Sequence, residues 1–309
     1  MENLIKKLDL NEYITNFSKL FAREKPIILE GDINIHYKII SELSNYNINQ
    51  PSSVQNLDSQ LMHIQKQGIL RVYEIYEFIK IINYFLYLKR FNFEGKLLEW
   101  MDKIIIPNDI LKICEYFDDK ANLKEGVDED FDNIKQAIYK NKEEIKQSLY
   151  KTINSSKIKP YLVDMQVHFI NEQECLLVRG GFNHILSGSV IDRSNSGFFY
   201  VIPHSVSDLK QKQSDLKNKQ EEILFRLCKE ISHIFERNLL FLKFINKEFD
   251  RFDHYQARIF FSKIGDKNFI LPSKKDENKL VDFCHPALSS PKPITIDFSK
   301  SVIMITGVN

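Results

Sequence analysis

The amino-acid sequence predicts a mainly α-helical protein with one small antiparallel β-domain inserted between long helices. Glycine and proline are scarce: the 309 residues include ten glycines and nine prolines, roughly half the usual share. Two stretches, 127–159 and 204–264, contain neither residue and carry apolar residues at helical spacing. Between them, four glycines crowd into 180–197, as expected for tight turns between short strands.

Residues 1–125 are expected to form a core of several helices. The window 69–88 is the most apolar of the chain, and its charged residues argue against a membrane span. We therefore predict a helix there that is buried on all sides. Shorter helices are expected over 97–105 and 108–117. The polar stretch 46–60 contains proline and serine and is predicted to be a loop.

The two stretches that lack glycine and proline predict one helix over 126–160 and a longer one over 204–264. Each carries an apolar stripe that must be buried, so we expect the two helices to pair as antiparallel coiled-coil lever arms. Thirty helical residues would give an arm about 45 Å long. Two helices of an ordinary bundle are the alternative. Asn141 and Lys142 interrupt the first stripe. The stripes consist of Val127, Phe131, Ile134, Ile138, Ile145, Leu149 and Ile153, and of Leu209, Leu216, Ile223, Leu227, Ile234, Phe241, Ile245, Phe249 and Phe252.

The insert over 161–203 alternates between apolar and polar residues, which predicts a small antiparallel β-module at the tip of the helical arm. Gly, Asn and Ser supply the turns between its strands. The expected strands cover 161–169, 175–178, 189–191 and 198–202, and the expected turns lie at 171–172, 180–181 and 193–197.

The last segment, 265–309, is expected to be irregular or strand-like over 267–280 and to contain a strand pair, 294–298 with 301–305. The second of these strands runs into Thr306, Gly307, Val308 and Asn309. An apolar strand followed by Thr-Gly-x-Asn is how a phosphate-binding loop begins. The full motif also needs a second glycine, a lysine and a Ser or Thr, and none follows here. We expect an incomplete nucleotide-binding loop, with a chance strand end as the alternative.

Composition excludes several classes of protein. The formal net charge is +1, from 43 basic and 42 acidic residues, which argues against a strongly basic nucleic-acid coat. The four cysteines are widely separated and the histidines lack ligand spacing, so we expect reduced thiols and no metal site. No secretory signal is visible, and the sequence predicts a cytoplasmic protein. The sequence shows no arrangement of Ser, His and Asp, of paired carboxylates, or of Cys and His that would predict a catalytic residue.

The order of these elements resembles the MutS family of DNA-handling ATPases, and within it the second bacterial MutS branch, linked to recombination suppression and ribosome rescue. That branch carries the clamp pattern Asp-x-Ser-x-Ser-Gly-x-x-x-x-Ile-x-Pro. Residues 192–197 read Asp-Arg-Ser-Asn-Ser-Gly and match it. The match continues to Ile202, which directly precedes Pro203 without the expected intervening residue. His285-Pro286 resembles the opening of the family's ATPase domain.

The resemblance implies a domain organisation: a helical core at 1–125, an ascending lever helix at 126–160 and a β clamp at 161–203. A descending lever helix at 204–264 and an incomplete start of the ATPase domain at 265–309 would follow. For the whole protein it implies ATP and Mg as cofactors, a homodimer, and often a C-terminal nuclease module. Its partners would be branched or double-stranded DNA, or the ribosome and its rRNA, with no membrane role.

The mismatch-reading members of the family use a Phe-x-Glu wedge. No phenylalanine of this chain is followed two positions later by Glu, so we expect no mismatch recognition. Without a complete loop, we expect this chain to bind no nucleotide well and to hydrolyse no ATP.

Nucleic-acid contact at the clamp would need cations or donors on turns, directed at phosphates. Six residues lie on predicted turns of the β-module, and two lysines share one face of the first long helix. The alternatives are turn geometry for the six and an ordinary solvated helix face for the lysines, because 161–217 holds five basic and six acidic residues. The candidates are Arg179, Asn183, His184, Arg193, Ser194 and Asn195, with Lys142 and Lys146.

Two hypotheses follow for function. The first is the clamp and lever portion of a MutS-type ATPase that embraces branched DNA or collided ribosomes. The second is a coiled-coil protein-interaction scaffold with no nucleic-acid role, which predicts no salt-sensitive binding to DNA or RNA. The acidic cluster within 128–132 is interpreted as a favourable helix N-terminus and not as a metal site.

Overall fold

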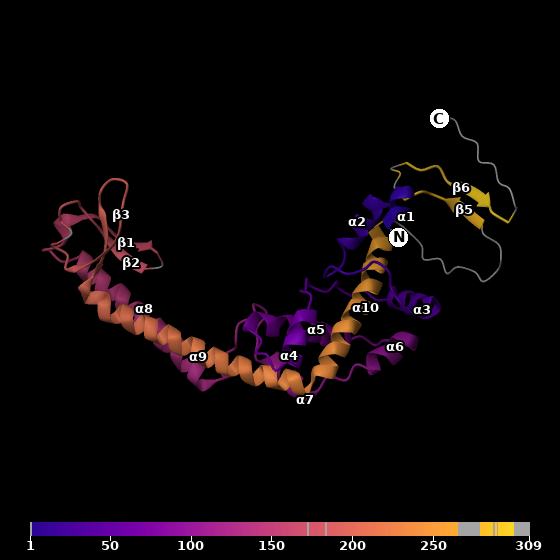
Figure 1. Cartoon of the computed structure of the whole chain (residues 1–309), viewed down its shortest axis with the longest axis horizontal. Helices are drawn as coiled ribbons and strands as arrows, with labels where there is room; N and C mark the ends of the chain where they lie inside the picture. The colour runs from indigo at the N-terminus through magenta and orange to yellow at the C-terminus, as the bar shows by residue number, and fades with distance from the viewer. Residues whose placement is uncertain are drawn as a thin grey trace. The chain divides into compact units, whose positions relative to one another are not determined.

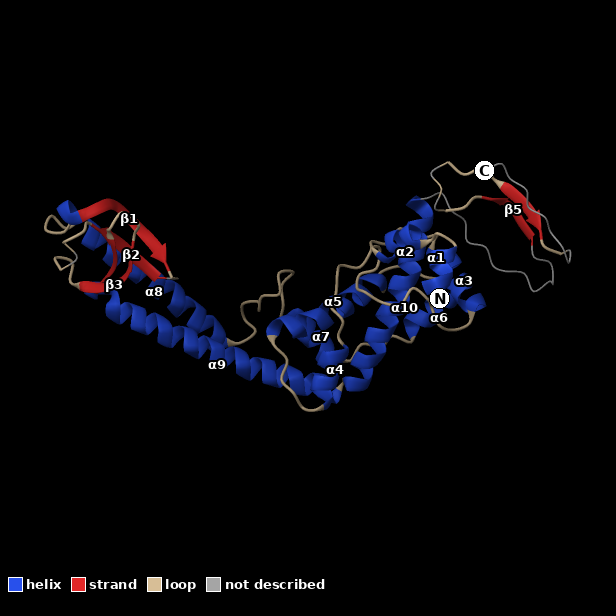
Figure 2. Ribbon diagram, turned by 45° about the horizontal axis from the view of Figure 1, so that its top comes forward, coloured by secondary structure: helices blue, strands red, loops and turns tan. Residues whose placement is uncertain are grey.

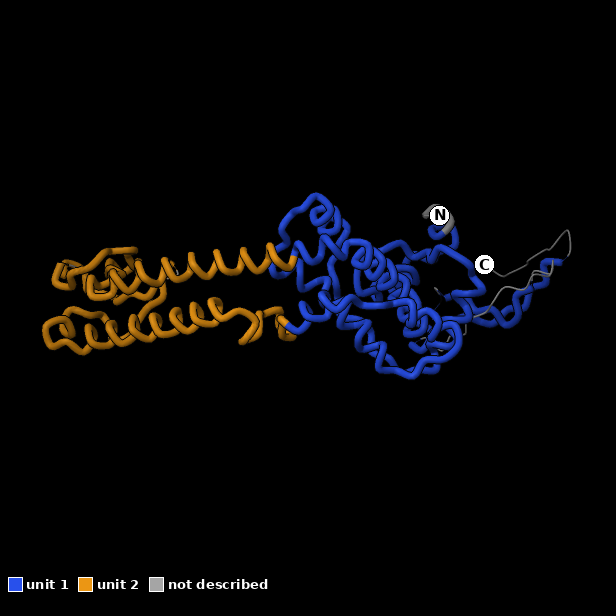
Figure 3. The backbone as a smooth tube through the Cα atoms, turned by 90° about the horizontal axis from the view of Figure 1, so that it is seen from below, with its two compact units in different colours: residues 1–115, 232–309 blue, residues 116–231 orange. Residues whose placement is uncertain are grey.

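The computed structural model describes residues 2–171, 173–182, 184–264, 279–286, 288 and 290–299. It is mostly helical and contains a small antiparallel sheet of four strands. The chain divides into two compact units (Figure 3): unit 1 comprises residues 1–115 and 232–309, and unit 2 comprises 116–231. Among the residues that the structure describes, no helix combines the length and apolar character that crossing a membrane requires.

Unit 1 is built from eight helices of the described chain and a two-stranded hairpin (Figure 1). Residues 232–237 of a further helix, α9, also belong to it. The helices are α1 (Glu2–Lys7), α2 (Asn11–Ser18), α3 (Ile33–Leu43), α4 (Asp58–Gln65), α5 (Val72–Leu88), α6 (Gly95–Asp102), α7 (Asn108–Glu115) and α10 (Leu239–Ile264), and the strands are β5 (Lys279–Phe283) and β6 (Ile294–Asp297).

Helix α5 is part of the core of unit 1 and begins at Val72, three residues later than predicted. The prediction that it is buried on all sides is wrong, because Tyr73 is 50% exposed and Asn83 is exposed as well. Seven of its side chains are buried, as its apolar run predicts. The side chain of Glu74 accepts a hydrogen bond of 2.8 Å from the backbone N–H of Arg71, which satisfies one of the orphan donors at the helix start. Phe78 packs edge-on against Phe235, with ring centroids 5.4 Å apart. Helix α10 contacts both α5 and α3 and so closes the core.

A buried charge network ties the segment after α2 to α10. The guanidinium of Arg23 donates to both carboxylate oxygens of Asp250, at 2.7 and 2.8 Å. The ammonium of Lys25 lies 2.7 Å from Asp250 and 2.6 Å from Asp253. Burial alone would raise the pKa of Asp250. Hydrogen bonding from Arg23 and the charge of Lys25 outweigh burial and lower this pKa. For Asp253, burial prevails over the attraction of Lys25 and raises the pKa.

His254 predicts a loss of stability in acid. Burial, aided by the charge of Arg258, lowers its pKa from 6.5 to about 4. The unfolded chain therefore binds the proton more tightly than the folded one, so the stability is complete above pH 6.5 and falls as the pH drops toward 4. We expect this histidine to contribute a loss of about 2–3 kcal/mol between pH 7 and pH 4.5, measured by urea unfolding.

The control for this prediction is His254→Gln, which retains an acceptor for the Nη1 donor of Arg258, 3.0 Å from Nδ1 in the parent. The stability difference between the parent and this variant should shrink on acidification. An unchanged difference between pH 7 and pH 4.5 would contradict the assignment to His254.

Unit 2 contains α8 (Glu129–Ile153), most of α9 (Ser207–Arg237) and four strands, β1 (Leu162–Ile170), β2 (Gln173–Val178), β3 (Gly188–Arg193) and β4 (Phe199–Pro203). Helix α8 begins at the N-cap Asp128, whose carboxylate accepts from the N–H of Phe131 at 2.8 Å. It is thus shorter than the predicted helix over 126–160. Short 3₁₀ turns, η1 (Lys159–Tyr161) and η2 (His204–Val206), join the helices to the strands.

Helices α8 and α9 lie side by side and antiparallel within unit 2 (Figures 1 and 2). Residues near the start of α8 contact residues near the end of α9. Residues later in α8 contact residues earlier in α9. Arg226 bonds to Asp128 at 2.7 Å, and the amide of Asn141 donates to the carbonyl of Leu209 at 3.2 Å. The second predicted stripe does not stay on one helix, because Phe241, Ile245, Phe249 and Phe252 lie in α10 of unit 1.

Asn141 predicts a stabilising substitution. Its side chain is fully buried, and Oδ1 accepts no hydrogen bond from the residues that the structure describes. A half-satisfied buried amide loses more in desolvation than its single hydrogen bond returns. We expect Asn141→Leu to raise the free energy of unfolding of unit 2 by about 1 kcal/mol in a denaturant titration. A large loss of stability would mean that the bond to Leu209 fixes the pairing of the two helices.

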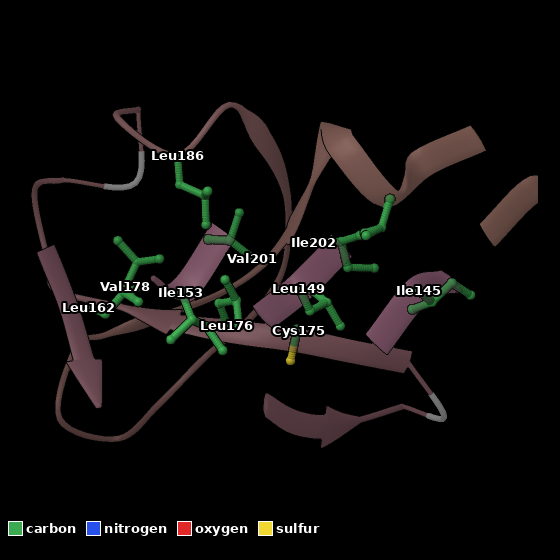
Figure 4. Close-up of a cluster of buried hydrophobic side chains, with 11 residues drawn as sticks. Ile145, Leu149, Ile153, Leu162, Cys175, Leu176, Val178, Leu186, Val201 and Ile202 are labelled. Atoms are coloured by element: carbon green, nitrogen blue, oxygen red, sulfur yellow. The ribbon is translucent and has the colours of Figure 1, made fainter. Parts of the chain in front are cut away.

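The four strands form an antiparallel sheet in the order β1-β2-β4-β3, here called the sheet module, which confirms the predicted β insert. Gly188 at the start of β3 is required by a close approach, because a Cβ there would lie 2.3 Å from the carbonyl oxygen of Ile202. One face of the sheet packs on the end of α8: Figure 4 shows Leu149 and Ile153 of that helix beside Leu176 of β2. Burial of this cluster fastens the sheet to the helix.

One prediction about the second half of the chain is wrong, and another is tested only in part. The helix expected over 204–264 is divided at Asn238 into α9 and α10. The side-chain amide of Asn238 donates to the carbonyl of Ile234 at 2.9 Å, and such local bonds compete with helix propagation. The strand expected over 294–298 pairs, as β6, with β5 in an antiparallel hairpin. Its predicted partner, 301–305, lies outside the described residues.

Candidate nucleic-acid interface

Two of the predicted contact residues, Ser194 and Asn195, lie on the β3–β4 turn, and a third, Arg193, is the last residue of β3. Ser194 shapes the turn itself: its N–H donates to the carbonyl of Phe198 at 2.8 Å, and its Oγ accepts from the N–H of Phe198 at 3.1 Å. Asn195 is exposed. The guanidinium of Arg193 lies 5.3 Å from the ring centre of Phe199, a cation–π contact. Ser194 therefore fits the alternative interpretation, in which the residue stabilises the turn. Arg193 and Asn195 are exposed and present polar groups to solvent.

The segment after β2 carries Arg179 and His184, both exposed. The Nε–H of Arg179 donates to the carbonyl of Leu162 at 3.2 Å, and its backbone N–H donates to the carbonyl of Tyr161 at 2.9 Å. These bonds hold the arginine at the end of β2. Asn183, the remaining predicted contact of this segment, lies outside the described residues.

The two turns come together in space, although the sequence separates them. A pocket of about 610 Å³ lies between them and is here called the sheet pocket. A Cβ placed on Gly180 would lie 3.1 Å from the carbonyl oxygen of Gly197, so the backbones of the turns approach closely. The residues that line the sheet pocket are Val163, Arg179, Gly180, Phe182, Ser196, Gly197 and Phe198.

Sequence reasoning missed Phe182 and Phe198, because it searched the turns for cations and hydrogen-bond donors. The available signal was a large apolar residue directly after a Gly-Gly turn, where polar residues are usual. Phe182 is 41% exposed. Its ring centre lies 5.0 Å from that of Tyr161, with an angle of 35° between the planes.

Lys142 and Lys146 are exposed on α8, and the contacts of the described residues do not join them to the turns. Seven residues separate Lys146 from Ile153, the end of the helix, which is about 10 Å along the axis. Lys146 lies 3.9 Å from Glu143 in a solvated pair that contributes little. The two lysines therefore lie apart from the turns, on a solvated face of α8.

The buried titratable groups of the sheet module have structural roles. Burial raises the pKa of the Cys175 thiol to about 11, so it remains protonated and unreactive near neutral pH. Lys210 of α9 pairs with Glu174 of β2, and burial lowers the pKa of this lysine. The pair joins α9 to the sheet.

No group of three or more His, Cys, Asp or Glu side chains within the described parts of the chain could hold a metal ion. Two carboxylates of the acidic cluster serve the start of α8: Asp128 caps the helix, and Asp132 accepts from the N–H of Gly126 at 2.7 Å. The predicted nucleotide-binding residues, Thr306, Gly307, Val308 and Asn309, lie outside the described residues.

Comparison with known proteins gives two strong matches. No model of a known protein family matches the chain. Two relatives named Endonuclease MutS2, from Helicobacter pylori strains 26695 and J99, are 33% and 34% identical to it over 312 residues. Endonuclease MutS2 of Borreliella burgdorferi is 25% identical over 207 residues, 66% of this chain and 26% of that relative.

The similarity to the Helicobacter relatives covers 99% of this chain and 41% of each relative. It therefore includes the helices of both units as well as the sheet module, and it agrees with the resemblance carried by the Asp-Arg-Ser-Asn-Ser-Gly turn. The chain belongs to the MutS family, in its MutS2 type, and spans about 41% of the length of the Helicobacter relatives that it matches.

Proposed function

We propose that this chain is the clamp and lever portion of a MutS2-type ATPase that embraces branched or recombination-intermediate DNA, or collided ribosomes, without mismatch recognition. The observation that carries the proposal is the arrangement of unit 2. An antiparallel helix pair, α8 with α9, ends in a sheet module that carries the exposed Arg179 and Arg193. The relatives named Endonuclease MutS2 support the same assignment.

In this proposal, α8 and α9 act as lever arms and the sheet module acts as the clamp. Basic and acidic residues are nearly balanced over 161–217, so attraction to phosphates alone would be weak. A clamp that surrounds its substrate gains affinity from topology and needs few charges. Closure would require a second copy in a homodimer, and the energy would come from ATP with Mg bound by a complete phosphate loop.

The charge balance also favours the second candidate, a protein-interaction scaffold built on the α8/α9 pair. Exposed apolar side chains along unit 2, such as Tyr139 and Phe225, could serve protein contacts. The two candidates differ in one measurable property, because only nucleic-acid binding releases condensed counterions and weakens steeply with salt.

The decisive experiment measures binding of the purified chain to a four-way DNA junction, a linear duplex and ribosomes between 50 and 200 mM salt. We expect the junction to bind more tightly than the duplex, with an affinity that falls as salt rises. The double variant Lys142→Gln with Lys146→Gln should flatten the slope of log K against log salt by about two. Lys96→Gln, an exposed lysine of α6 in unit 1, is the matched control and should change nothing.

The absence of salt-sensitive binding to DNA and to ribosomes would reject the proposal and favour the scaffold. Binding to ribosomes alone would assign the ribosome as the target.

A further inference from the structure

The sheet pocket combines three features that a solvated turn does not require: an accessible aromatic ring, a held cation and a wall of glycine backbone. Its volume of about 610 Å³ lies within the range of small-molecule sites, roughly 300–1,000 Å³. The proposed clamp function accounts for cations on the turns but not for a pocket between them.

The aromatic ring is Phe182. Its side chain is 41% exposed, and Tyr161 supports it from one side with ring centres 5.0 Å apart. The neighbouring residue Tyr161 is itself fixed, because its carbonyl accepts the backbone hydrogen bond of Arg179. A large apolar ring held partly open to water is costly unless a partner covers it. Phe198 adds a second aromatic side chain to the lining.

The cation is Arg179. Its Nε–H is bonded to the carbonyl of Leu162, which fixes the plane of the guanidinium at the pocket wall. Among the described residues it takes part in no ion pair, and no acidic residue belongs to the pocket lining. A planar cation without a carboxylate partner beside an aromatic ring suits an anionic ligand with a flat apolar part.

Two glycines, Gly180 and Gly197, contribute backbone without side chains to the pocket lining. These residues have no side chains to fill the space, and a Cβ on Gly180 would meet the carbonyl oxygen of Gly197 at 3.1 Å. The recess itself is the sheet pocket, which Phe182 lines together with these two glycines.

We propose that the sheet pocket accepts one unpaired base of a single-stranded nucleic acid, stacked on Phe182, while Arg179 meets the adjacent phosphate. A base inside a duplex cannot reach the ring without leaving its stack, at a cost of a few kcal/mol. Stacking on an aromatic side chain is tolerant of sequence, which suits a protein without base-specific donors on these turns. The inference rests on the proposed nucleic-acid function and names the strand state that the clamp recognises.

The test compares binding of a fluorescent single-stranded oligothymidine and of a fully paired duplex by anisotropy. We expect Phe182→Ala to weaken binding of the single strand about tenfold or more, the contribution of one stacked base, and Arg179→Ala to weaken it as well. Binding of the duplex should change little with Phe182→Ala. Phe169→Ala removes another exposed phenylalanine of the same sheet, outside the pocket, and should leave both affinities unchanged.

Phe182→Trp keeps a stacking ring and provides a second readout. It should retain affinity for the single strand, and its fluorescence should be quenched on binding. Trp100, the one native tryptophan, is buried and hydrogen-bonded to Glu248, so it supplies a constant background.

The inference is overturned if the junction and duplex bind but the single strand does not, or if Phe182→Ala and Phe169→Ala have equal effects. Unquenched tryptophan at saturation would overturn it too. Failure of all nucleic acids to bind would instead reject the proposed function, and this inference with it.

Discussion

Lys25→Met is expected to lower the free energy of unfolding of unit 1 by about 3–5 kcal/mol, the usual effect of removing one partner from a buried ion pair. The side chain of Lys25 is 5% exposed, and that of Asp253 is 2% exposed. Methionine keeps the apolar stem between Phe21 and Phe249, whose ring centres lie 5.4 and 5.7 Å from the ammonium. The loss of stability therefore reports the removal of the charge alone. Urea unfolding would measure this loss.

The second substitution Asp253→Asn provides the control. An asparagine oxygen can still accept the N–H of Ala22, which donates to Asp253 at 2.9 Å, but carries no charge to leave unpaired. We expect the double variant, Lys25→Met with Asp253→Asn, to recover part of the lost stability. The effect of Lys25→Met alone should shrink at low pH, where Asp253 becomes protonated. If the double variant were less stable than the single one, the unpaired charge would not be the cause.

Leu149→Ala is expected to lower the stability of unit 2 by about 2–5 kcal/mol, from lost apolar transfer and the cavity left behind. Leu149 is fully buried in the cluster that fastens the sheet module to α8. Amide hydrogen exchange should show the loss locally: protection in β1, β2 and β4 should fall, while that of α5 in unit 1 should stay the same.

Tyr150→Ala is the matched control, because the next residue of the same helix is 48% exposed. It should change stability by no more than about 0.5 kcal/mol. Unchanged protection of the strands in Leu149→Ala would mean that the sheet module holds its structure without α8.

The elements that depend on local pattern could be predicted from the sequence. Alternation of apolar residues and a cluster of glycines are local properties, and they gave the four strands and their turns with errors of one or two residues. The buried helix α5 followed from one apolar run. The division at Asn238 could not be foreseen, since the flanking residues all favour a helix and the interruption depends on one side chain bonding to Ile234.

The charge network of unit 1 could not be predicted from the sequence, for a different reason. Ala22 and Asp253 are 231 residues apart, and no spacing rule links such positions. Single charged residues on a helix are ordinarily solvated, so Asp250 and Asp253 carried no signal. The placement of the candidate residues was predicted in part: Arg179 directly follows β2, whereas Arg193 is the last residue of β3 and not a turn residue. Only the fold brings Phe182 and Gly197 to one pocket.

The discontinuity of unit 1 has a consequence for biosynthesis. Its N-terminal helices bury their apolar faces against α10, and the carbonyl of Ile27 meets Arg258, 231 residues later. At ribosomal speeds of about 5–20 residues per second, the first segment leaves the exit tunnel roughly 10–50 s before its partner. During that interval α5 would expose its apolar surface, whereas unit 2 is contiguous and can fold first. Nascent chains should therefore engage a chaperone until α10 emerges, a demand set by chain order and independent of the stability of the finished protein.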